Sequence, residues 1–151
     1  MDNYFDKASE MIWEELQNGK NIVLATSADD KVSVRTVSGV SYNENIYIVT
    51  DSQSKKCAQI ILNDNVALCT DTIKITGIAH LLGHPLDEKN TLAADALRTG
   101  FGDWFNQYAT SPNAVLIEIS PNSAELAIMG EGAPEVYSID FITQTAIMQH
   151  Q

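Results

Sequence analysis

The sequence predicts a mainly β protein with flanking helices, built as a small antiparallel barrel. Short runs rich in β-branched residues follow one another, and tight polar turns separate them. One short helical segment lies among these runs and an amphipathic helical pattern precedes them. Tight turns favour antiparallel pairing, because parallel strands need longer crossover connections. With 151 residues and 44% hydrophobic content, the chain is expected to form a single domain, residues 1–151.

The charge balance excludes several classes of partner. Nine Lys and Arg stand against twenty Asp and Glu, for a formal net charge of −11, so neither nucleic acid nor an anionic membrane is expected to bind. No basic leader and no run long enough to span a membrane is present. The two cysteines have no metal or redox spacing, which is typical of reduced thiols. These features predict a soluble, cytoplasmic protein.

The first third of the chain contains a helix and three strands. Residues 2–18 are predicted to be an amphipathic helix that ends at Asn18-Gly19. Strands are predicted at Asn21–Ser27, Lys31–Ser41 and Asn45–Thr50. Strict alternation in the second strand places Arg35 on one face with small or apolar neighbours. The arginine is therefore either an exposed residue on an edge strand or a ligand for an anion.

The rest of the chain alternates between strands and helical segments. Strands are predicted at Val66–Thr70, Ile73–Leu82, Ala114–Ser120, Ala124–Met129 and Glu135–Phe141, with a turn at Pro121-Asn122 and a bulge or close backbone approach at Gly77. Leu86–Tyr108 has a helical pattern that Gly100 and Gly102 divide into two pieces. The tail from Thr143 to Gln151 carries no signal and is expected to fray.

The segment from Thr50 to Val66 is the first candidate for a site. It leaves a strand, passes through a polar loop and enters a helix that Ser52 or Ser54 can cap. Cys57, Ile60 and Ile61 then form the apolar face of this helix. The helix ends at Asn63–Asn65.

Two adjacent lysines occupy the unfavourable end of this helix. Lys55 and Lys56 lie in its first turn, where the positive end of the helix dipole disfavours cations. A bound anion would explain them, held by the ammonium groups, the hydroxyls of Thr50, Ser52 and Ser54, and free backbone N–H groups. The alternative is a solvated lysine pair on a helix end.

The two central histidines do not predict a metal site. His80 and His84 would lie about 13 Å apart on a straight strand, which is too far to chelate one ion. Pro85 indicates that His84 lies in a loop instead.

Three short motifs resemble the pyridoxamine 5′-phosphate oxidase-like superfamily of FMN-binding split barrels. Arg35-Thr36-Val37 matches its R-x-V motif, Thr50 to Lys56 matches T-x-x-x-S-[RK]-K, and Asn63 to Val66 matches an N-P-x-V-like stretch. Ile73 to Gly77 corresponds to a later strand of the family that contains a small residue. The resemblance covers roughly residues 10–140 and implies a split barrel of about six to eight antiparallel strands.

The resemblance also implies a cofactor and its ligands. FMN would lie in a groove between the subunits of a homodimer, with its phosphate on Arg35, Lys55 and Lys56. The remaining residues that this implies for the cofactor site are Thr36, Val37, Ser38, Val49, Thr50, Ser52, Ser54 and Thr72. A dimer also agrees with the strand Asn45–Thr50, which is apolar on both faces, whereas one barrel interior buries one face.

Departures from the family pattern restrict the function. Ser38-Gly39-Val40 replaces the Leu-Leu-Lys of the vitamin B6 enzyme, and no Arg follows Arg98 and no Trp follows Trp104. The chain therefore does not resemble a true pyridoxamine 5′-phosphate oxidase but a short, general-stress-protein-26-like member. A flavin-dependent oxidoreductase acting on a small molecule, a non-catalytic flavin-binding sensor or carrier, and a haem or deazaflavin F420 binder all remain open. For haem, His80 or His84 would become important.

Overall fold

The computed structural model describes residues 3–150. Its elements are α1 (Phe5–Leu16), β1 (Lys20–Ala28), β2 (Lys31–Tyr42), β3 (Asn45–Asp51), α2 (Lys55–Leu62), β4 (Asn65–Thr70), β5 (Ile73–Leu81), a 3-10 turn (Glu88–Asn90), α3 (Thr91–Phe101), α4 (Asp103–Ala109), β6 (Ala114–Ile128), β7 (Glu135–Asp140) and β8 (Thr145–His150). The order of helices and strands agrees with the sequence-based prediction except at β6 and β8.

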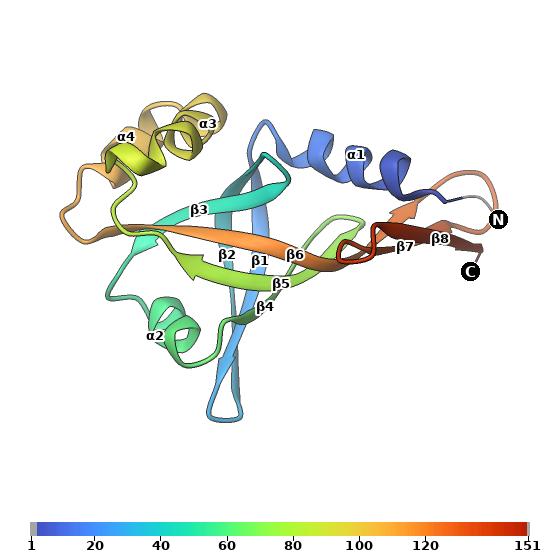
Figure 1. The fold of residues 1–151 in the computed structure, drawn as a ribbon, viewed down its shortest axis with the longest axis horizontal. Coiled ribbons are helices and arrows are strands. Elements are labelled where there is room, and N and C mark those ends of the chain that lie inside the picture. Colours follow the sequence, from blue (N-terminus) through green and yellow to red (C-terminus); the bar gives the residue numbers. More distant parts are fainter. Residues whose placement is uncertain (1–2, 151) are drawn as a thin grey trace.

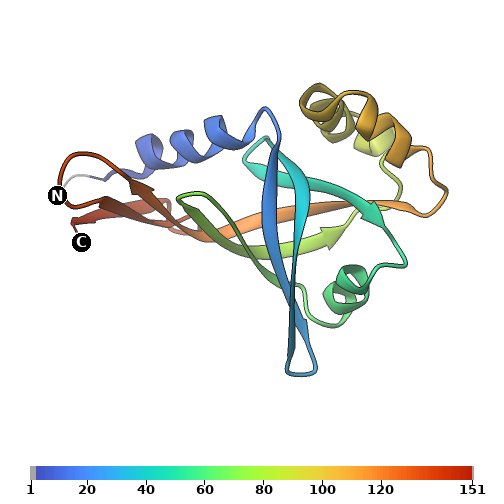
Figure 2. The same cartoon turned by 180° about the vertical axis from the view of Figure 1, so that it is seen from behind.

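Six of the strands close into an antiparallel barrel. The sheet order is β3-β2-β1-β4-β5-β6-β7-β8, and an additional β3–β6 pairing closes the first six strands into a ring. The strands β7 and β8 continue the sheet outside the barrel, where α1 packs on them (Figure 1). The pair α3 and α4 packs on β2, β3 and β6, whereas α2 packs on β1 and β5 (Figure 2). The predicted mainly β split-barrel class is confirmed.

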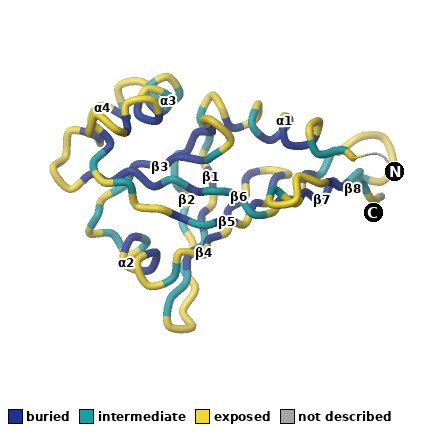
Figure 3. Tube along the Cα trace, viewed as in Figure 1, coloured by how far each residue is buried: buried dark blue, intermediate teal, exposed yellow. Residues whose placement is uncertain are grey.

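Two hydrophobic clusters stabilise this arrangement. Figure 3 shows where the buried residues lie along the chain. The larger cluster fills the barrel and extends under α1, and it includes Ile46 and Ile48 of β3. The smaller cluster lies between the outer face of the barrel and the pair α3 and α4, and it includes Tyr47 and Val49. Both faces of β3 are therefore buried within one chain. The prediction that one of them needs a second subunit was wrong, because the sequence pattern does not reveal which helices cover which face.

The strand β6 corrects another prediction. Pro121 and Asn122 were predicted to form a turn, but both lie inside one continuous strand. There, β6 exchanges neighbours: up to Ile119 it pairs with β3, and from Ser123 onward with β7. Proline has no N–H to donate, and it is tolerated here because position 121 falls between these two ladders. The opposite strand has its irregularity at Thr76/Gly77, as predicted for Gly77.

The C-terminal part also differs from prediction. The tail was expected to fray, yet Thr145–His150 forms β8, paired with β7, and Ala146 is buried. Residue 2, which was predicted to begin the first helix, and Gln151, the last residue of the predicted tail, lie outside the described residues. The helical region breaks at Gly102, which has φ +61°, so the predicted two pieces are confirmed. Within residues 3–150, no helix is long and apolar enough to cross a membrane.

Candidate functional site

The helix α2 begins where β3 ends, and Ser54 is its N-cap. The Ser54 Oγ accepts a hydrogen bond from the N–H of Cys57 at 3.4 Å, which confirms one of the two predicted caps. Cys57 and Ile60 face the core as predicted, but Ile61 is 71% exposed. The residue buried in its place is Gln59, because its amide has hydrogen-bond partners on β1 and β2.

Lys56 points back towards the end of β3. Its Nζ donates to the Thr50 Oγ1 at 2.6 Å. Burial lowers the pKa of this ammonium group below its ordinary value of 10.5, and the nearby positive charge of Arg35 lowers it further, while Cys57 and Asp51 act in the opposite direction. Lys55, by contrast, is exposed. The two adjacent lysines therefore have different environments.

Arg35 lies on the inward face of β2. This strand pairs with β1 along most of its length, but with β3 only from Gly39 to Tyr42. Arg35 thus stands where β2 has a neighbour on one side alone, and its side chain is half-buried against that neighbour. The Arg35 Nη1 donates to the Leu24 carbonyl at 3.2 Å and to the Thr26 Oγ1 at 2.8 Å. Burial lowers the pKa of the guanidinium, which still remains charged at neutral pH.

We call Arg35, Lys56 and Thr50 the cationic cluster. Arg35 and Lys56 are close enough to affect each other electrostatically, and within residues 3–150 neither makes an ion pair with a carboxylate. Two half-buried like charges repel each other, and this occurs in a chain with a net charge of −11. An oxyanion bound between them would remove the repulsion. The alternative of a solvated lysine pair therefore describes Lys55 but not Lys56.

The loop before α2 does not offer the free backbone donors that were expected. The N–H of Ser52 donates to the Asn113 carbonyl at 2.8 Å, that of Gln53 to the Asp51 Oδ1 at 2.8 Å, and that of Ser54 to the Asp51 carbonyl at 3.0 Å. These groups are used to fold the loop. The N–H groups of Lys55 and Lys56, at the start of α2, have no acceptor within residues 3–150. These two groups and the side chains are therefore the donors available to an anion.

The other residues implied for the cofactor are distributed over the barrel. Val37 packs against the main core, whereas Thr36 is exposed on the opposite face of β2. The Ser38 hydroxyl donates to the Asn21 Oδ1 at 3.3 Å. Val49 is buried under α3 and α4, and Thr72 lies in the turn from β4 to β5. The structure thus brings Arg35, Thr50 and Lys56 together, with Ser54 close by in the chain, but not Val49 or Thr72.

The histidines have separate environments. His84 holds its own loop: its Nδ1 accepts from the N–H of Leu86 at 3.1 Å, and its Nε2 lies 2.9 Å from the Ser111 carbonyl. His80 is exposed on β5, opposite Glu118 of β6. Among the described residues, no group of three or more His, Cys, Asp or Glu side chains could hold a metal ion.

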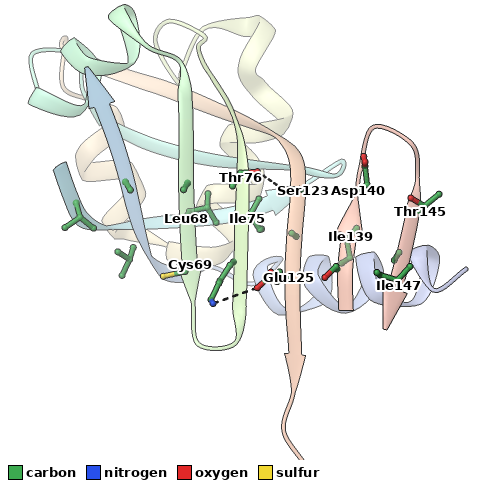
Figure 4. Close-up of a pocket in the computed structure, with 18 residues that line it drawn as sticks. Leu68, Cys69, Ile75, Thr76, Ser123, Glu125, Ile139, Asp140, Thr145 and Ile147 are labelled. Atoms are coloured by element: carbon green, nitrogen blue, oxygen red, sulfur yellow. Dashed lines mark hydrogen bonds and ion pairs between the residues drawn. The ribbon is translucent and has the colours of Figure 1, made fainter. Parts of the chain in front are cut away.

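A groove of about 800 Å³ lies on the outer face of the barrel (Figure 4). Its wall includes Val23 and Val34, and Ile147 of β8 lines the far side. On its lining, two polar contacts join paired residues of β5 and β6: the hydroxyls of Thr76 and Ser123 lie 2.6 Å apart, and Lys74 lies 3.9 Å from Glu125. We call this hollow the outer groove. Val34 faces it while the next residue, Arg35, faces inward, so two successive residues of β2 belong to two different sites.

Two residues near Arg35 were missed in the sequence. Thr26 and Gln59 are 2% and 7% exposed and are hydrogen-bonded to each other. A signal was present for Thr26, because the alternation Ile22, Leu24, Thr26 places a hydroxyl at an inward position. A polar residue at an inward position needs a buried partner. That partner is on α2, and the sequence does not reveal which side chain it is.

Comparison with known proteins identifies the fold. No protein-family model matches the chain, and no curated protein matches it. Among solved structures, General Stress Protein 26 from Bacillus anthracis str. Sterne is 21% identical with a TM-score of 0.62. The alignment covers 80% of this chain and 92% of that protein's chain. A pyridoxamine 5′-phosphate oxidase-related, FMN-binding protein from Nostoc punctiforme is 17% identical with a TM-score of 0.59, covering 97% and 94%. The haem storage protein HutZ from Vibrio cholerae is 13% identical with a TM-score of 0.62, covering 78% and 89%.

At these identities the likeness shows the fold. The chain has the split-barrel fold of FMN-binding proteins related to pyridoxamine 5′-phosphate oxidase, and the resemblance predicted from its motifs is confirmed at that level. Because proteins with this fold are described both as FMN-binding and as haem-storing, the fold does not define the ligand.

Proposed function

We propose that this protein binds FMN and acts as an FMN-dependent oxidoreductase on a small molecule. The observation that carries the proposal is the cationic cluster: the half-buried Lys56 donates to Thr50, Arg35 lies within electrostatic range of it, and neither cation has a carboxylate partner among the described residues. A cytoplasmic location, expected from the two free cysteines, belongs to the same proposal. So does the organisation of residues 1–151 as one domain.

The residues present suit the phosphate of FMN. Guanidinium and ammonium groups only donate hydrogen bonds, and both are positively charged, so together they complement a phosphate dianion. The Ser54 Oγ accepts from a backbone N–H, which leaves its own hydrogen free to donate. Ser52 adds a further hydroxyl, and Lys55 a solvent-exposed positive charge near the same helix end. We propose all of these residues as phosphate ligands, with Arg35 and Lys56 contributing most.

The chain's own role is to bind and orient. FMN, when bound, supplies hydride and electron transfer, so the protein needs no catalytic triad or carboxylate pair of its own. Thr36, Val37 and Ser38 adjoin Arg35 in the part of β2 that β3 leaves unpaired, and we propose that they border the flavin ring. Thr72 lies elsewhere on the barrel, so any contact that it makes with a flavin held here is proposed to come from a second subunit. The Val49 side chain is buried under α3 and α4, so we propose that Val49 adjoins the cofactor through its backbone, next to Thr50.

A homodimer remains part of the proposal, supported by a different surface than expected. The outer groove exposes apolar side chains, among them Val34 at 64% and Val23 at 38%. Exposed apolar surface of this kind is typical of interaction sites. A second copy packed on it would cover side chains that α3 and α4 leave uncovered, and Val34 would connect this interface directly to Arg35.

An absorption spectrum and two titrations test the proposal. The purified protein should carry a flavin spectrum, or keep one after FMN is added and the unbound FMN is removed. FMN should bind at least about tenfold more tightly than riboflavin, since a charge-assisted hydrogen bond contributes roughly 1.5–3 kcal/mol. Equal affinity for the two flavins would exclude the cationic cluster as the phosphate site. NAD(P)H consumption by the flavin-loaded protein then separates an oxidoreductase from a non-catalytic flavin carrier.

Haem is the second candidate, because a haem storage protein shares the fold. Both ring nitrogens of His84 already have partners, so of His80 and His84 it is the exposed His80 that offers an imidazole to iron. A Soret band in the purified protein would favour haem, and a deazaflavin spectrum would favour F420.

Efficient oxidation of pyridoxamine 5′-phosphate is not part of the proposal, because the residues after Trp104 lack the Trp and Arg that the vitamin B6 enzyme uses.

A further inference from the structure

A buried polar chain connects α2 with Arg35. The Thr26 Oγ1 lies 2.5 Å from the Gln59 Oε1, and the Arg35 Nη1 donates to the same hydroxyl oxygen at 2.8 Å. The amide of Gln59 continues the chain, because its Nε2 donates to the Ser33 Oγ at 3.3 Å and to the Lys31 carbonyl at 3.5 Å. Thr26 and Gln59 are both more than nine-tenths buried. Three elements, β1, β2 and α2, therefore meet in one hydrogen-bonded network.

The direction of each hydrogen bond follows from the donors available. A guanidinium cannot accept, so Thr26 accepts from Arg35 and has one hydrogen left, which it donates to Gln59. If the Gln59 amide were reversed, its oxygen would face the Lys31 carbonyl, placing two acceptors against each other. The amide orientation is therefore set by the network. In turn, it sets the direction of the Thr26 hydroxyl.

This network fixes one edge of the guanidinium. Both Nη1 hydrogens of Arg35 are used, one on the Leu24 carbonyl and one on Thr26. What remains is the edge formed by Nε and Nη2, for which the structure gives no partner among residues 3–150. That edge presents parallel N–H groups, which is the geometry of bidentate oxyanion binding.

We propose that Thr26 and Gln59 are positioning residues for the phosphate of the cofactor and act through Arg35. They do not touch the ligand. They hold the Nη1 side of the guanidinium against the barrel wall, so that the Nε and Nη2 side faces the space shared with Lys56. The inference rests on the proposed function, because it concerns the same phosphate.

Selective loss of phosphate recognition is the expected signature. Thr26→Val removes the hydroxyl without changing the side-chain shape. We expect it to weaken FMN binding about 3- to 10-fold, less than the loss of a charged ligand because Thr26 acts only through Arg35, while riboflavin binding stays unchanged. Thr26→Ser keeps the hydroxyl and should bind FMN as the wild type does. Ser27→Ala is the matched control, since it removes a hydroxyl that connects β1 with Asn63 after α2 but does not touch Arg35.

A double-mutant cycle decides whether Thr26 acts through Arg35. In an Arg35→Ala background, Thr26→Val should cause no further loss of FMN affinity, because coupled residues are not additive. If single removal of the hydroxyl prevents folding, Thr26→Val/Gln59→Met removes both buried polar partners together and keeps the comparison possible. It should show the same selective loss.

The outcomes are distinguishable. An equal loss for FMN and riboflavin, an unchanged FMN affinity, or additive effects with Arg35→Ala would each overturn the positioning role while leaving the phosphate site intact. A wild-type protein that binds FMN and riboflavin alike would instead reject the proposed function.

Discussion

Lys55 and Lys56 are neighbours in sequence but not in environment. Lys56 is half-buried and bonded to Thr50, whereas Lys55 is exposed. We predict that Lys56→Met weakens FMN binding roughly 10- to 150-fold, as for loss of a charge-assisted hydrogen bond. Lys55→Met, the matched control, should weaken it by at most about 5-fold, since exposed charge pairs contribute up to about 1 kcal/mol. Flavin fluorescence titration measures both.

The same variants separate binding from folding. Removing a cation from the N-terminal end of α2 relieves its repulsion with the helix dipole, so the free energy of unfolding of both apo variants should stay within about 1 kcal/mol of the wild type. The affinity for riboflavin should be almost the same in both variants as in the wild type. Equal FMN affinity of Lys56→Met and wild type would remove the cationic cluster from the site.

The lowered pKa of Lys56 gives a pH dependence with a definite sign. Between the folded-state pKa and the ordinary value of 10.5, the unfolded chain binds more protons at this residue than the folded chain. The free energy of unfolding of the apo protein therefore gains a contribution as pH rises through this window, and below it the buried charge is destabilising. FMN affinity should fall over the same window, because the ammonium group loses its charge.

The difference between wild type and Lys56→Met isolates this effect from other titrating groups. Denaturant unfolding and FMN titration, each measured as a function of pH, should give opposite slopes for the wild type. Both slopes should diminish in Lys56→Met. Identical pH profiles for the two proteins would contradict the prediction.

At the level of single elements, Gly77 allows the backbone of β5 to approach the backbone of β6 closely. A Cβ at this position would lie 2.4 Å from the Ser120 carbonyl oxygen, which belongs to the backbone and cannot rotate away. We predict that Gly77→Ala lowers the free energy of unfolding by about 1–3 kcal/mol, as for an overpacked core. Gly130→Ala is the control, since nothing lies within 4 Å of its Cβ. Equal denaturation midpoints for the two variants would show that the strands can separate without cost.

The elements differ in how far the sequence could predict them. Strands with regular alternation, such as β2, were predicted within one or two residues, because one face is buried and the other is not. The turn at Pro121 was wrong because proline normally interrupts a strand, and the exception depends on where β6 exchanges β3 for β7. The burial of Gln59 instead of Ile61 was equally hidden, since it depends on a hydroxyl of β1.

The site could also be predicted only in part from the sequence. Arg35, Thr50 and Lys56 were all singled out from the sequence, because positive charge at a helix start and on a strand of small residues is unusual in an acidic chain. The hydrogen bond from Lys56 to Thr50, and the electrostatic effect of Arg35 on Lys56, could not be deduced from composition. Thr26 was missed although strand alternation places its hydroxyl at an inward position, because the sequence does not reveal its partner on α2.

For the whole molecule, the outer groove predicts the oligomeric state. Val34 is 64% exposed on this face, and Leu92 of α3 is also 64% exposed but lies elsewhere. We predict a dimer in dilute solution that Val34→Lys converts to a monomer, whereas Leu92→Lys leaves it intact, because a lysine buried in an apolar interface is strongly unfavourable. Analytical ultracentrifugation distinguishes them. A wild-type monomer that binds FMN tightly would count against a cofactor site shared between subunits.

The closure of the barrel by β3 and β6 has a consequence for folding kinetics. Pairs such as Ile46 with Ile119 are far apart in sequence, so this ladder has high contact order and is expected to form late. The side chains around the phosphate site all come from the segment between Thr26 and Gln59, which can associate before the ring closes. We therefore expect FMN to increase the refolding rate measured by stopped-flow fluorescence, instead of only slowing unfolding. The cofactor would then serve as a template on which the first half of the barrel assembles.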